Sequence, residues 1–316
     1  MALPPDRVAL AALQDALKAI EAAATGDTSS AVINRIRKGL AAHADALEAV
    51  RGATDPVKMP RATFDPADPK VVGRMVSLAL LAQPLVPLRR VVPAYGSGVY
   101  AIYYRGDHPL YAAISRTETP IYVGKADPQN DDASDSREQG SRLTARLLEH
   151  AGTIATAEAY AGAGSLPVGL HAIRLEDFDC RRLVCATNAQ LVAEKHLIRT
   201  FWPLWNQETK ACWGMSKHGD AAGTRANKRS PWDVVHPGRN WALDARLVDS
   251  LSPDQIRTKV AETLEKVPPR TDHASLLEEM LQAFRQDDGV EVQEVEEPPV
   301  GAEAAGPDDD EAGKEA

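Results

Sequence analysis

Two short runs of β-branched and aromatic residues constrain the fold of this chain more than any other feature. The first run is Gly98-Val-Tyr-Ala-Ile-Tyr-Tyr104, and the second is Pro120-Ile-Tyr-Val-Gly-Lys125. Runs of this composition, separated by charged and turn-prone residues, predict two paired strands. We expect each strand to expose a tyrosine near a glycine, which is an unusual choice for residues that only fill a core.

The length and composition are those of a soluble globular protein. The chain has 316 residues, of which 44% are hydrophobic and 26% charged, enough for one large domain or two modest ones. It has neither a long apolar run nor a basic-then-apolar leader, so we expect no membrane span and no secretion signal. The cysteines Cys180, Cys185 and Cys212 are odd in number and lack Cys-x-x-Cys spacing. This favours a reducing cytoplasm over disulfides or structural zinc.

The charge is unevenly distributed along the chain. Twelve acidic residues and one lysine give residues 287–316 a net charge of −11, so the remainder of this −9 chain carries +2. Residues 195–239 hold eight Lys or Arg against three acidic residues, a local charge of +5 that suits a phosphate backbone. A solvated basic face without a ligand explains this charge equally well. The tail over 287–316 is expected to be disordered, and its acidity acts either to aid solubility or to mimic DNA.

Helical periodicity surrounds the two strands. Apolar residues recur at helical spacing in seven segments, which are 6–24, 29–51, 71–85, 141–150, 189–201, 253–265 and 272–285. The first two form a hairpin, and Asn188, Ser252 and Thr271 are expected to cap later helices. A third strand is predicted over 170–175, where residues alternate, after a Gly/Ala-rich loop that runs through Gly164. The fold class is therefore α+β, a small three-stranded sheet flanked by helices, with helical N- and C-terminal extensions.

Shifts in composition divide the chain into six predicted segments. They are a helical hairpin (1–60), a helix and lead-in (61–94), a core with the strand pair (95–210), a basic Trp-rich segment (211–245), C-terminal helices (246–286) and the acidic tail (287–316).

Six residues with chemically useful side chains follow one another in a fixed order on these elements. They are Tyr100 and Tyr122 on the strands, Arg146 and His150 on the next helix, Glu194 on the helix after it, and Asn206 beyond that helix. The arginine and the histidine are four residues apart and so share one face of their helix. Each residue alone has an ordinary structural explanation, such as a half-buried strand tyrosine or a histidine that complements a helix dipole.

As an ordered set, these residues resemble the GIY-YIG nuclease superfamily over roughly residues 95–210. The name-giving triplets correspond to Gly98-Val99-Tyr100 and Tyr122-Val123-Gly124. The resemblance implies that Arg146 and His150 are the family's helix residues, that Glu194 binds the metal and that Asn206 is the family's downstream asparagine.

The flanking phrases look like the type II restriction endonucleases of this superfamily. They are Gly-Val-Tyr-Ala-Ile-Tyr-Tyr, Pro-Ile-Tyr-Val-Gly-Lys-Ala, and the stretch from Trp232 to Ala242. The match is best to the branch that cuts the SacII-type palindrome CCGCGG, although no residue here shows that specificity. The likeness implies a homodimer on a palindromic site, with Mg²⁺ (or Mn²⁺) in each active site.

The residue types suit phosphodiester hydrolysis independently of any family. This reaction needs an activated water, a counter-charge for the phosphorane and a proton for the leaving oxygen. A lone carboxylate such as Glu194 holding a hydrated Mg²⁺ is a normal arrangement. Arg146 is suited to phosphate oxygens, with Arg142 as an alternative.

Two residues compete for the role of general base. Tyr100 has a free pKa of about 10 and needs a nearby cation, such as Lys125, an arginine or the metal, to lower it. His150 has a free pKa of about 6.5 and is the better base on intrinsic grounds. Tyr122 is expected to position groups by hydrogen bonding, and Asn206 to hold a tyrosine or the glutamate loop in place.

We expect double-stranded DNA as the partner, with a cognate DNA methyltransferase in the same system that is not a physical partner. Arginine pairs bidentately with guanine in the major groove, so basic residues are the candidate base contacts. The candidate DNA-binding residues are Arg142, Lys217, Arg225, Lys228, Arg229 and Arg239. Two other functions fit less well: a GIY-YIG nuclease of DNA repair or of a mobile element, and a catalytically dead DNA-binding protein.

Overall fold

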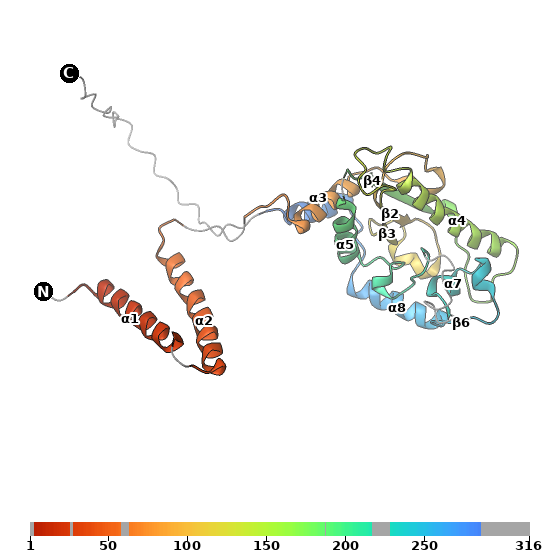
Figure 1. Cartoon of the computed structure of the whole chain (residues 1–316). Coiled ribbons are helices and arrows are strands. Elements are labelled where there is room, and N and C mark those ends of the chain that lie inside the picture. Colours follow the sequence, from red (N-terminus) through yellow and green to blue (C-terminus); the bar gives the residue numbers. More distant parts are fainter. Residues whose placement is uncertain (1–2, 26–27, 58–62, 187, 217–227, 286–316) are drawn as a thin grey trace, which may run out of the picture. The chain divides into compact units, whose positions relative to one another are not determined.

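The computed structural model describes residues 3–25, 28–57, 63–186, 188–216 and 228–285 (Figure 1). The chain forms two units, one from residues 64–285 and the other from residues 1–63 with 286–316. In the described part of the chain, no helix combines the length and the apolarity needed to cross a membrane. Lys217, Arg225 and the predicted disordered tail lie outside the described residues.

The N-terminal unit contains the predicted helical hairpin. Its helices are α1, Pro5–Thr25, and α2, Ser30–Thr54. Both are rich in alanine, the residue with the highest helix propensity, which explains their length. Neither helix contains a buried residue.

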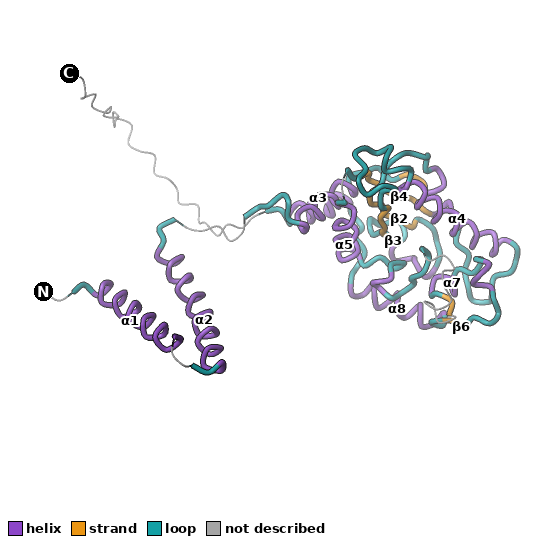
Figure 2. The backbone as a smooth tube through the Cα atoms, viewed as in Figure 1, coloured by secondary structure: helices purple, strands orange, loops and turns teal. Residues whose placement is uncertain are grey.

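The second unit is built on a four-stranded antiparallel sheet in the order β1-β4-β2-β3 (Figure 2). Its strands are β1 (Val86–Pro87), β2 (Gly98–Tyr104), β3 (Tyr122–Ala126) and β4 (Phe178–Val184). The predicted pairing of the two tyrosine-bearing strands is confirmed, with Tyr100 opposite Gly124. All seven residues of β2 are buried, whereas β3 is an edge strand. The two-residue strand β1 was not predicted.

Side chains of β2 alternate between two hydrophobic cores, as the strand period of two requires. Val99, Ala101 and Tyr103 belong to one core. The helices that contribute to this core are α3 (Pro69–Leu81), α5 (Ala189–Phe201) and α9 (His273–Gln282). Tyr100 and Ile102 belong to the other core. It contains residues of α4 (Arg142–Gly162), α7 (Pro231–Val235) and α8 (Pro253–Lys266). The sheet therefore lies between two helical layers.

Short elements complete the described part of this unit. They are the 3₁₀ helices η1 (Leu88–Arg90), η2 (Pro109–Ile114), η3 (Leu175–Asp177), η4 (Gln207–Thr209) and η5 (Asn240–Leu243), and a parallel pair of two-residue strands, β5 (Lys228–Arg229) and β6 (Val248–Asp249).

The third strand of the predicted sheet was placed wrongly. Residues 170–174 are irregular, and the strand is β4, which begins at Phe178. Charged residues hide β4 in the sequence, because Asp179, Arg181 and Arg182 interrupt its apolar pattern. Arg105 donates to the Asp179 carboxylate at 3.2 Å, so this charge is neutralised by tertiary contact.

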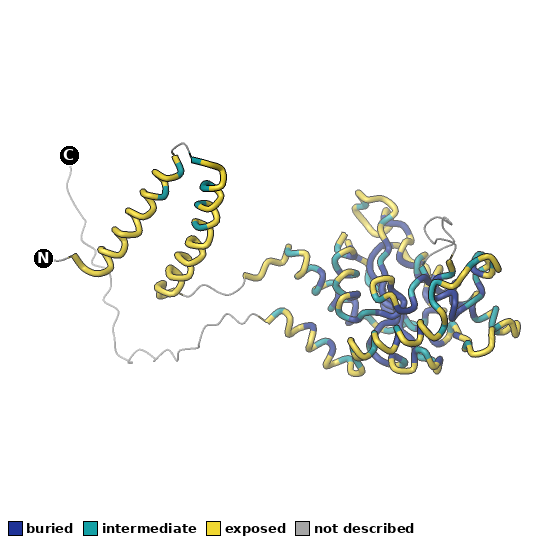
Figure 3. The backbone as a smooth tube through the Cα atoms, turned by 90° about the horizontal axis from the view of Figure 1, so that it is seen from below, coloured by how far each residue is buried: buried dark blue, intermediate teal, exposed yellow. Residues whose placement is uncertain are grey.

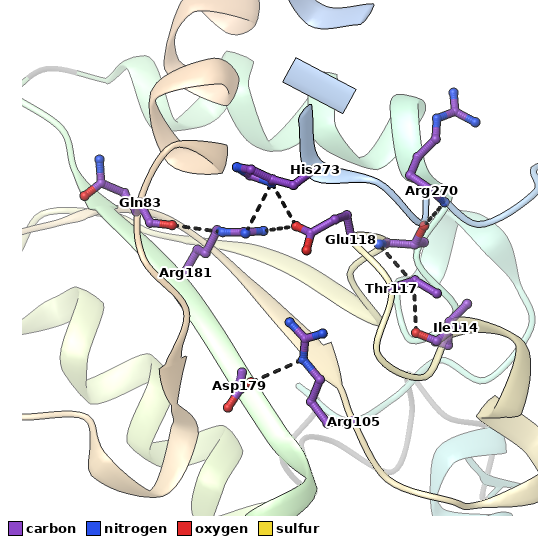
Figure 4. Close-up of polar contacts among 10 residues, drawn as sticks. Gln83, Arg105, Ile114, Thr117, Glu118, Asp179, Arg181, Arg270 and His273 are labelled. Carbon is purple, nitrogen blue, oxygen red and sulfur yellow. Dashed lines mark hydrogen bonds and ion pairs between the residues drawn. The ribbon is translucent and has the colours of Figure 1, made fainter. Parts of the chain in front are cut away.

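Arg181 is the most deeply buried of these charges and is surrounded by acceptors (Figure 4). Its guanidinium donates to the Glu118 carboxylate at 2.8 Å and to the Gln83 carbonyl at 2.9 Å. Glu118 also contacts Nδ1 of His273 at 3.0 Å, at the first residue of α9. A buried charge is tolerated only when it is paired, and here the pairing joins the sheet to the C-terminal helix.

Helix α4 is longer than predicted. It continues to Gly162, so the Gly/Ala-rich loop expected after His150 is wrong over most of its length. The alanines favour the helix. His150 consequently lies within α4, and the alternative that it complements a helix C-terminus is also wrong.

Helix ends agree with the predictions in part. Ser252 forms a capping box with Gln255, as expected for a capping residue. Asp272, and not Thr271, caps α9 by accepting from the Ser275 N–H at 2.6 Å. Asn188 precedes α5, but its side chain makes no capping hydrogen bond to the backbone of the first turn.

Candidate active site

The two strand tyrosines lie next to each other beneath α4. Their ring centroids are 6.1 Å apart, and both rings contact the ring of His150. The Tyr100 hydroxyl and Nε2 of His150 are 2.6 Å apart. Tyr100 is 0% and Tyr122 is 7% exposed, so the expectation that they are exposed was wrong. α4 packs over this face of the sheet and covers them.

The two glycines of the family-like triplets are required by close approaches. A Cβ at Gly98 would lie 2.0 Å from the carbonyl oxygen of Leu183 on β4. A Cβ at Gly124 would lie 2.5 Å from the Tyr100 hydroxyl, because the two residues face each other across the strands. Both distances are far below van der Waals contact, so only glycine lets the tyrosine and the strands pack in this way.

Arg146 lies one turn before His150 on α4, as the spacing predicted. Burial raises the pKa of Tyr100 well above its usual value of 10, and the negative charges of Tyr122 and Glu194 act in the same direction. The Arg146 charge opposes this shift in both tyrosines but does not reverse it. Among the cations that the sequence offered for lowering the pKa of Tyr100, Arg146 does act in that direction. Burial has the larger effect, so the pKa of Tyr100 remains raised.

Glu194 projects from α5 into a half-buried position near Lys125. Burial raises its pKa to about 7. The Lys125 charge and backbone N–H oppose this shift, whereas Glu208 and Asp127 add to it. The Lys125 ammonium itself pairs with Asp127.

The donor set at Glu194 suits a hard divalent cation. A cation bound by Glu194 would relieve both the burial of its carboxylate and its repulsion from Glu208 and Asp127. No group of three or more His, Cys, Asp or Glu residues in the described ranges could hold a metal ion. A single carboxylate such as Glu194 can still hold a divalent cation that keeps most of its waters.

Asn206 is hydrogen-bonded to the edge strand β3. Among the hydrogen bonds of the described residues, none joins its side chain to Tyr100 or Tyr122. Its Oδ1 accepts from the Val123 N–H at 2.9 Å, and its Nδ2 donates to the Val123 carbonyl at 2.8 Å. The buried amide thus replaces a neighbouring strand at the residue that follows Tyr122. This contact fixes the backbone that carries Tyr122 and Gly124.

Three of these residues, Tyr122, Glu194 and Asn206, line a pocket of about 190 Å³, whose other walls come mainly from residues 205–216. Tyr100, Arg146 and His150 are not among the described residues that line it. Several of its lining residues were not predicted as site residues, among them Glu208, Trp213 and Ser216. Ser216 forms a side-chain hydrogen bond with Tyr122. The signal for Glu208 was a second carboxylate two residues after Asn206.

Arg239, one of the candidate DNA-binding residues, makes its described contacts within the protein. Arg239 donates to both carboxylate oxygens of Asp233 at 2.7 Å and to the Gly214 carbonyl at 2.8 Å. Its guanidinium also lies over the rings of Trp232 and Trp241. These contacts position the wall of the pocket at Gly214 and argue against base contact by Arg239.

The other described DNA candidates remain predictions. Arg142 and Lys228 are exposed, and Arg229 pairs with Asp249 at 2.6 Å.

A family model, the Eco29kI GIY-YIG domain, matches residues 93–264. The matched span covers more than half of the 316 residues and includes the six residues of the ordered set and Lys125, which is also predicted to take part in catalysis. No curated protein matches the chain.

Proposed function

Because this chain belongs to the Eco29kI GIY-YIG family of restriction endonucleases and is thus a DNA nuclease, we propose that it cuts double-stranded DNA at a short palindrome in a metal-dependent reaction. The observation that carries the proposal is the convergence at one pocket. The hydrogen-bonded pair of Tyr100 and His150 lies directly behind Tyr122, which shares the pocket with Glu194. A metal ligand and a proton acceptor within one small site are what phosphodiester hydrolysis needs.

The contact between Tyr100 and His150 defines a proton path. Burial makes a free tyrosinate costly, so Tyr100 accepts a proton from the attacking water only if its own proton leaves at the same time. His150 lies 2.6 Å away and receives that proton at Nε2. In this assignment both base candidates act as one unit.

Other residues of the chain supply charge and position. Arg146 is partly exposed beside the tyrosines and binds a phosphate oxygen after leaving its partner Glu149. Mg²⁺ or Mn²⁺ held by Glu194 would supply positive charge for the phosphate and the leaving oxygen. Asn206 keeps Tyr122 in register through Val123.

A basic groove between α3 and α5 supplies a path for the DNA backbone. It has a volume of about 420 Å³, and its polar lining residues are Lys70, Arg74, Lys195, His196 and Arg199. No acidic residue of the described chain lines it. Burial lowers the pKa of His196, and the charges of Arg74 and Arg199 add to this, which reflects the positive potential there.

Site specificity is proposed from the resemblance to the CCGCGG-cutting branch. A palindrome presents equivalent groups on both strands, so a two-fold homodimer matches it.

The test is digestion of plasmid DNA with Mg²⁺, followed by sequencing of the fragment ends. We expect discrete fragments with one palindrome at every end, and no fragments from Glu194→Ala. Glu262→Ala, an exposed site on α8, serves as the control and should cut normally. Cutting that survives Glu194→Ala would reject the site, and preferential cutting of branched DNA would favour the repair alternative.

A further inference from the structure

The buried core of the second unit, drawn in dark blue in Figure 3, contains a second tyrosine–histidine pair. The Tyr111 hydroxyl and Nε2 of His236 are 2.6 Å apart, the same separation as between Tyr100 and His150. Tyr111 is 0% and His236 is 2% exposed. Among the described residues, neither lines the pocket that contains Glu194. Hydrogen-bonded polar groups in a core connect parts of the fold, so the other contacts of this pair show what it holds.

The Tyr111 hydroxyl also contacts the wall of the active-site pocket at two points. Nε1 of Trp205, which lines the pocket, donates a hydrogen bond to this hydroxyl at 2.9 Å. Sγ of Cys212 lies 3.4 Å from the same hydroxyl. Both residues belong to the segment 205–216, which supplies most of the wall. One buried hydroxyl therefore connects His236 to two residues of that segment.

Trp205 connects this hydroxyl to the edge strand β3. Its backbone N–H donates to the Ile121 carbonyl at 3.0 Å, directly before Tyr122. The next residue, Asn206, binds the backbone of Val123, directly after Tyr122. Trp205 and Asn206 thus hold the chain on both sides of Tyr122. A displacement of Trp205 would therefore move the backbone of this site residue and the pocket wall together.

Packing alone does not explain the polar contacts of Tyr111. The Trp205 ring packs against the rings of Tyr111, Phe178 and Trp232, with centroids 5.4–5.9 Å apart. A phenylalanine in place of Tyr111 would keep this packing and avoid the cost of burying a hydroxyl. Ring contacts tolerate a range of offsets, whereas a hydrogen bond to the indole N–H also fixes its direction. The hydroxyl therefore orients Trp205 in addition to filling space.

The stretch of chain around His236 holds the same wall a second time. Arg239, three residues later, donates to the Gly214 carbonyl at 2.8 Å and to the Met215 carbonyl at 3.1 Å. Its guanidinium is itself fixed by both carboxylate oxygens of Asp233 at 2.7 Å. Two separate polar contacts therefore run from this stretch to the pocket wall.

We propose that Tyr111 and His236 are positioning residues of the nuclease site. The histidine holds the Tyr111 hydroxyl, and the hydroxyl holds the Trp205 indole. Trp205 in turn keeps Tyr122 and the pocket wall in the arrangement that cleavage needs. Neither member of the pair touches DNA or metal in this assignment, which rests on the proposed function.

The experiment compares Tyr111→Phe with Tyr104→Phe in the full-length chain. Both tyrosines are buried in the same core, and each substitution removes one hydrogen-bonded hydroxyl. The Tyr104 hydroxyl accepts from the His108 N–H at 2.8 Å, and the described hydrogen bonds of Tyr104 reach no residue of the wall. With saturating DNA and Mg²⁺, Tyr111→Phe should lower the single-turnover cleavage rate by roughly 10–100-fold. DNA affinity measured without Mg²⁺ should stay unchanged, and Tyr104→Phe should cut at the wild-type rate.

Two readouts separate positioning from a loss of stability. Thermal unfolding should show similar losses for Tyr111→Phe and Tyr104→Phe, so a rate that falls only in the first does not follow stability. In NMR spectra of ¹⁵N-tryptophan-labelled protein, Tyr111→Phe should shift the indole resonance of Trp205, which is assigned through Trp205→Phe. Tyr104→Phe should leave that resonance unchanged.

Substitutions of His236 test the other member of the pair. His236→Gln places an amide near the position of Nε2 and should keep most of the activity that His236→Leu loses. This comparison decides the question if Tyr111→Phe does not fold, and equal losses in the two variants would contradict the role of His236.

A cleavage rate that Tyr111→Phe leaves at the wild-type value, or an equal loss in Tyr104→Phe, overturns the positioning role alone. A wild type that cuts no DNA rejects the proposed function and this role with it.

Discussion

At the scale of single residues, the glycines of the strand pair are as necessary to the site as its polar side chains. Gly98 and Gly124 permit contacts that a Cβ would prevent, and one of these contacts is with the Tyr100 hydroxyl itself. The position of that hydroxyl decides whether it meets His150. The close backbone packing at Gly124 therefore determines whether the Tyr100 hydroxyl can form its hydrogen bond with His150.

The substitution Gly124→Ala tests this coupling. The added methyl group displaces Tyr100, so we expect cleavage to fall at least 100-fold and stability to fall by about 1–3 kcal/mol. Gly152→Ala on α4, where a Cβ meets nothing within 4 Å, is the matched control. It should cut normally and gain up to about 1 kcal/mol in stability. Thermal unfolding and cleavage rates measure both effects, and normal cutting by Gly124→Ala would contradict the proposed packing.

The proton path predicts that Tyr100 and His150 act as a unit. Tyr100→Phe and His150→Gln should each lower the single-turnover cleavage rate by roughly 10²–10⁴-fold. The double variant should be no slower than the slower single variant, because each change alone breaks the same path. DNA affinity measured without cleavage should stay unchanged in all three. Additive losses would show instead that the two residues act independently.

At the scale of elements, side chains that are distant in sequence connect the strands and helices around the site by polar contacts. Asn206 pairs with the edge of β3, and the Arg181–Glu118 pair joins β4 to the chain before β3. His273 extends that pair to α9. Polar contacts therefore fix the edge strand β3 and attach α9 to the sheet that carries the site.

Glu118→Ala should destabilise the protein by about 3–5 kcal/mol at pH 7, because it leaves Arg181 buried without its partner. Burial alone would raise the pKa of Glu118, but hydrogen bonds and charge from Arg181 and His273 outweigh it and lower the pKa. The stability it contributes is therefore fully present above the unfolded pKa of about 4.3 and is lost as the pH falls through the lower folded pKa.

Chemical denaturation between pH 7 and pH 3 measures this effect. The difference between the wild type and Glu118→Ala should shrink only below about pH 4. Glu265→Ala, at an exposed position of α8, should match the wild type throughout. A difference that disappears already at pH 6 would contradict the assignment of the effect to the Glu118 carboxylate.

At the scale of the whole molecule, net charge distinguishes the N-terminal hairpin from the groove between α3 and α5. The helical hairpin is neutral, whereas the groove between α3 and α5 collects cations from two helices. The sequence of α3 alone, or of α5 alone, does not indicate a basic surface. Packing at Gly73, whose Cβ would lie 3.0 Å from the Val192 carbonyl, brings the two helices close enough to combine their charges.

The groove makes a quantitative prediction for DNA binding. Each neutralised phosphate contact lowers the slope of log affinity against log salt by about 0.9. Lys70→Gln/Arg199→Gln removes two such contacts and should therefore make the slope less negative by about 2, and should weaken binding to all sequences alike. Lys259→Gln on α8, outside the groove, is the control. Fluorescence anisotropy over a salt series measures the slope, and an unchanged slope would remove the groove from the DNA path.

The sequence by itself determined most of the local elements and predicted the candidate site residues. The strand pair and the helices depend on periodicity and spacing, which are properties of the chain before it folds, and the ordered set from Tyr100 to Asn206 was predicted from its resemblance to a family. The tertiary structure decided the rest. Asp179 and Arg181 concealed β4 because their partners are distant in sequence, and contacts with Asp233 and two tryptophans gave Arg239 a structural role. Burial and pairing energies depend on which distant groups meet, and a linear pattern does not contain that information.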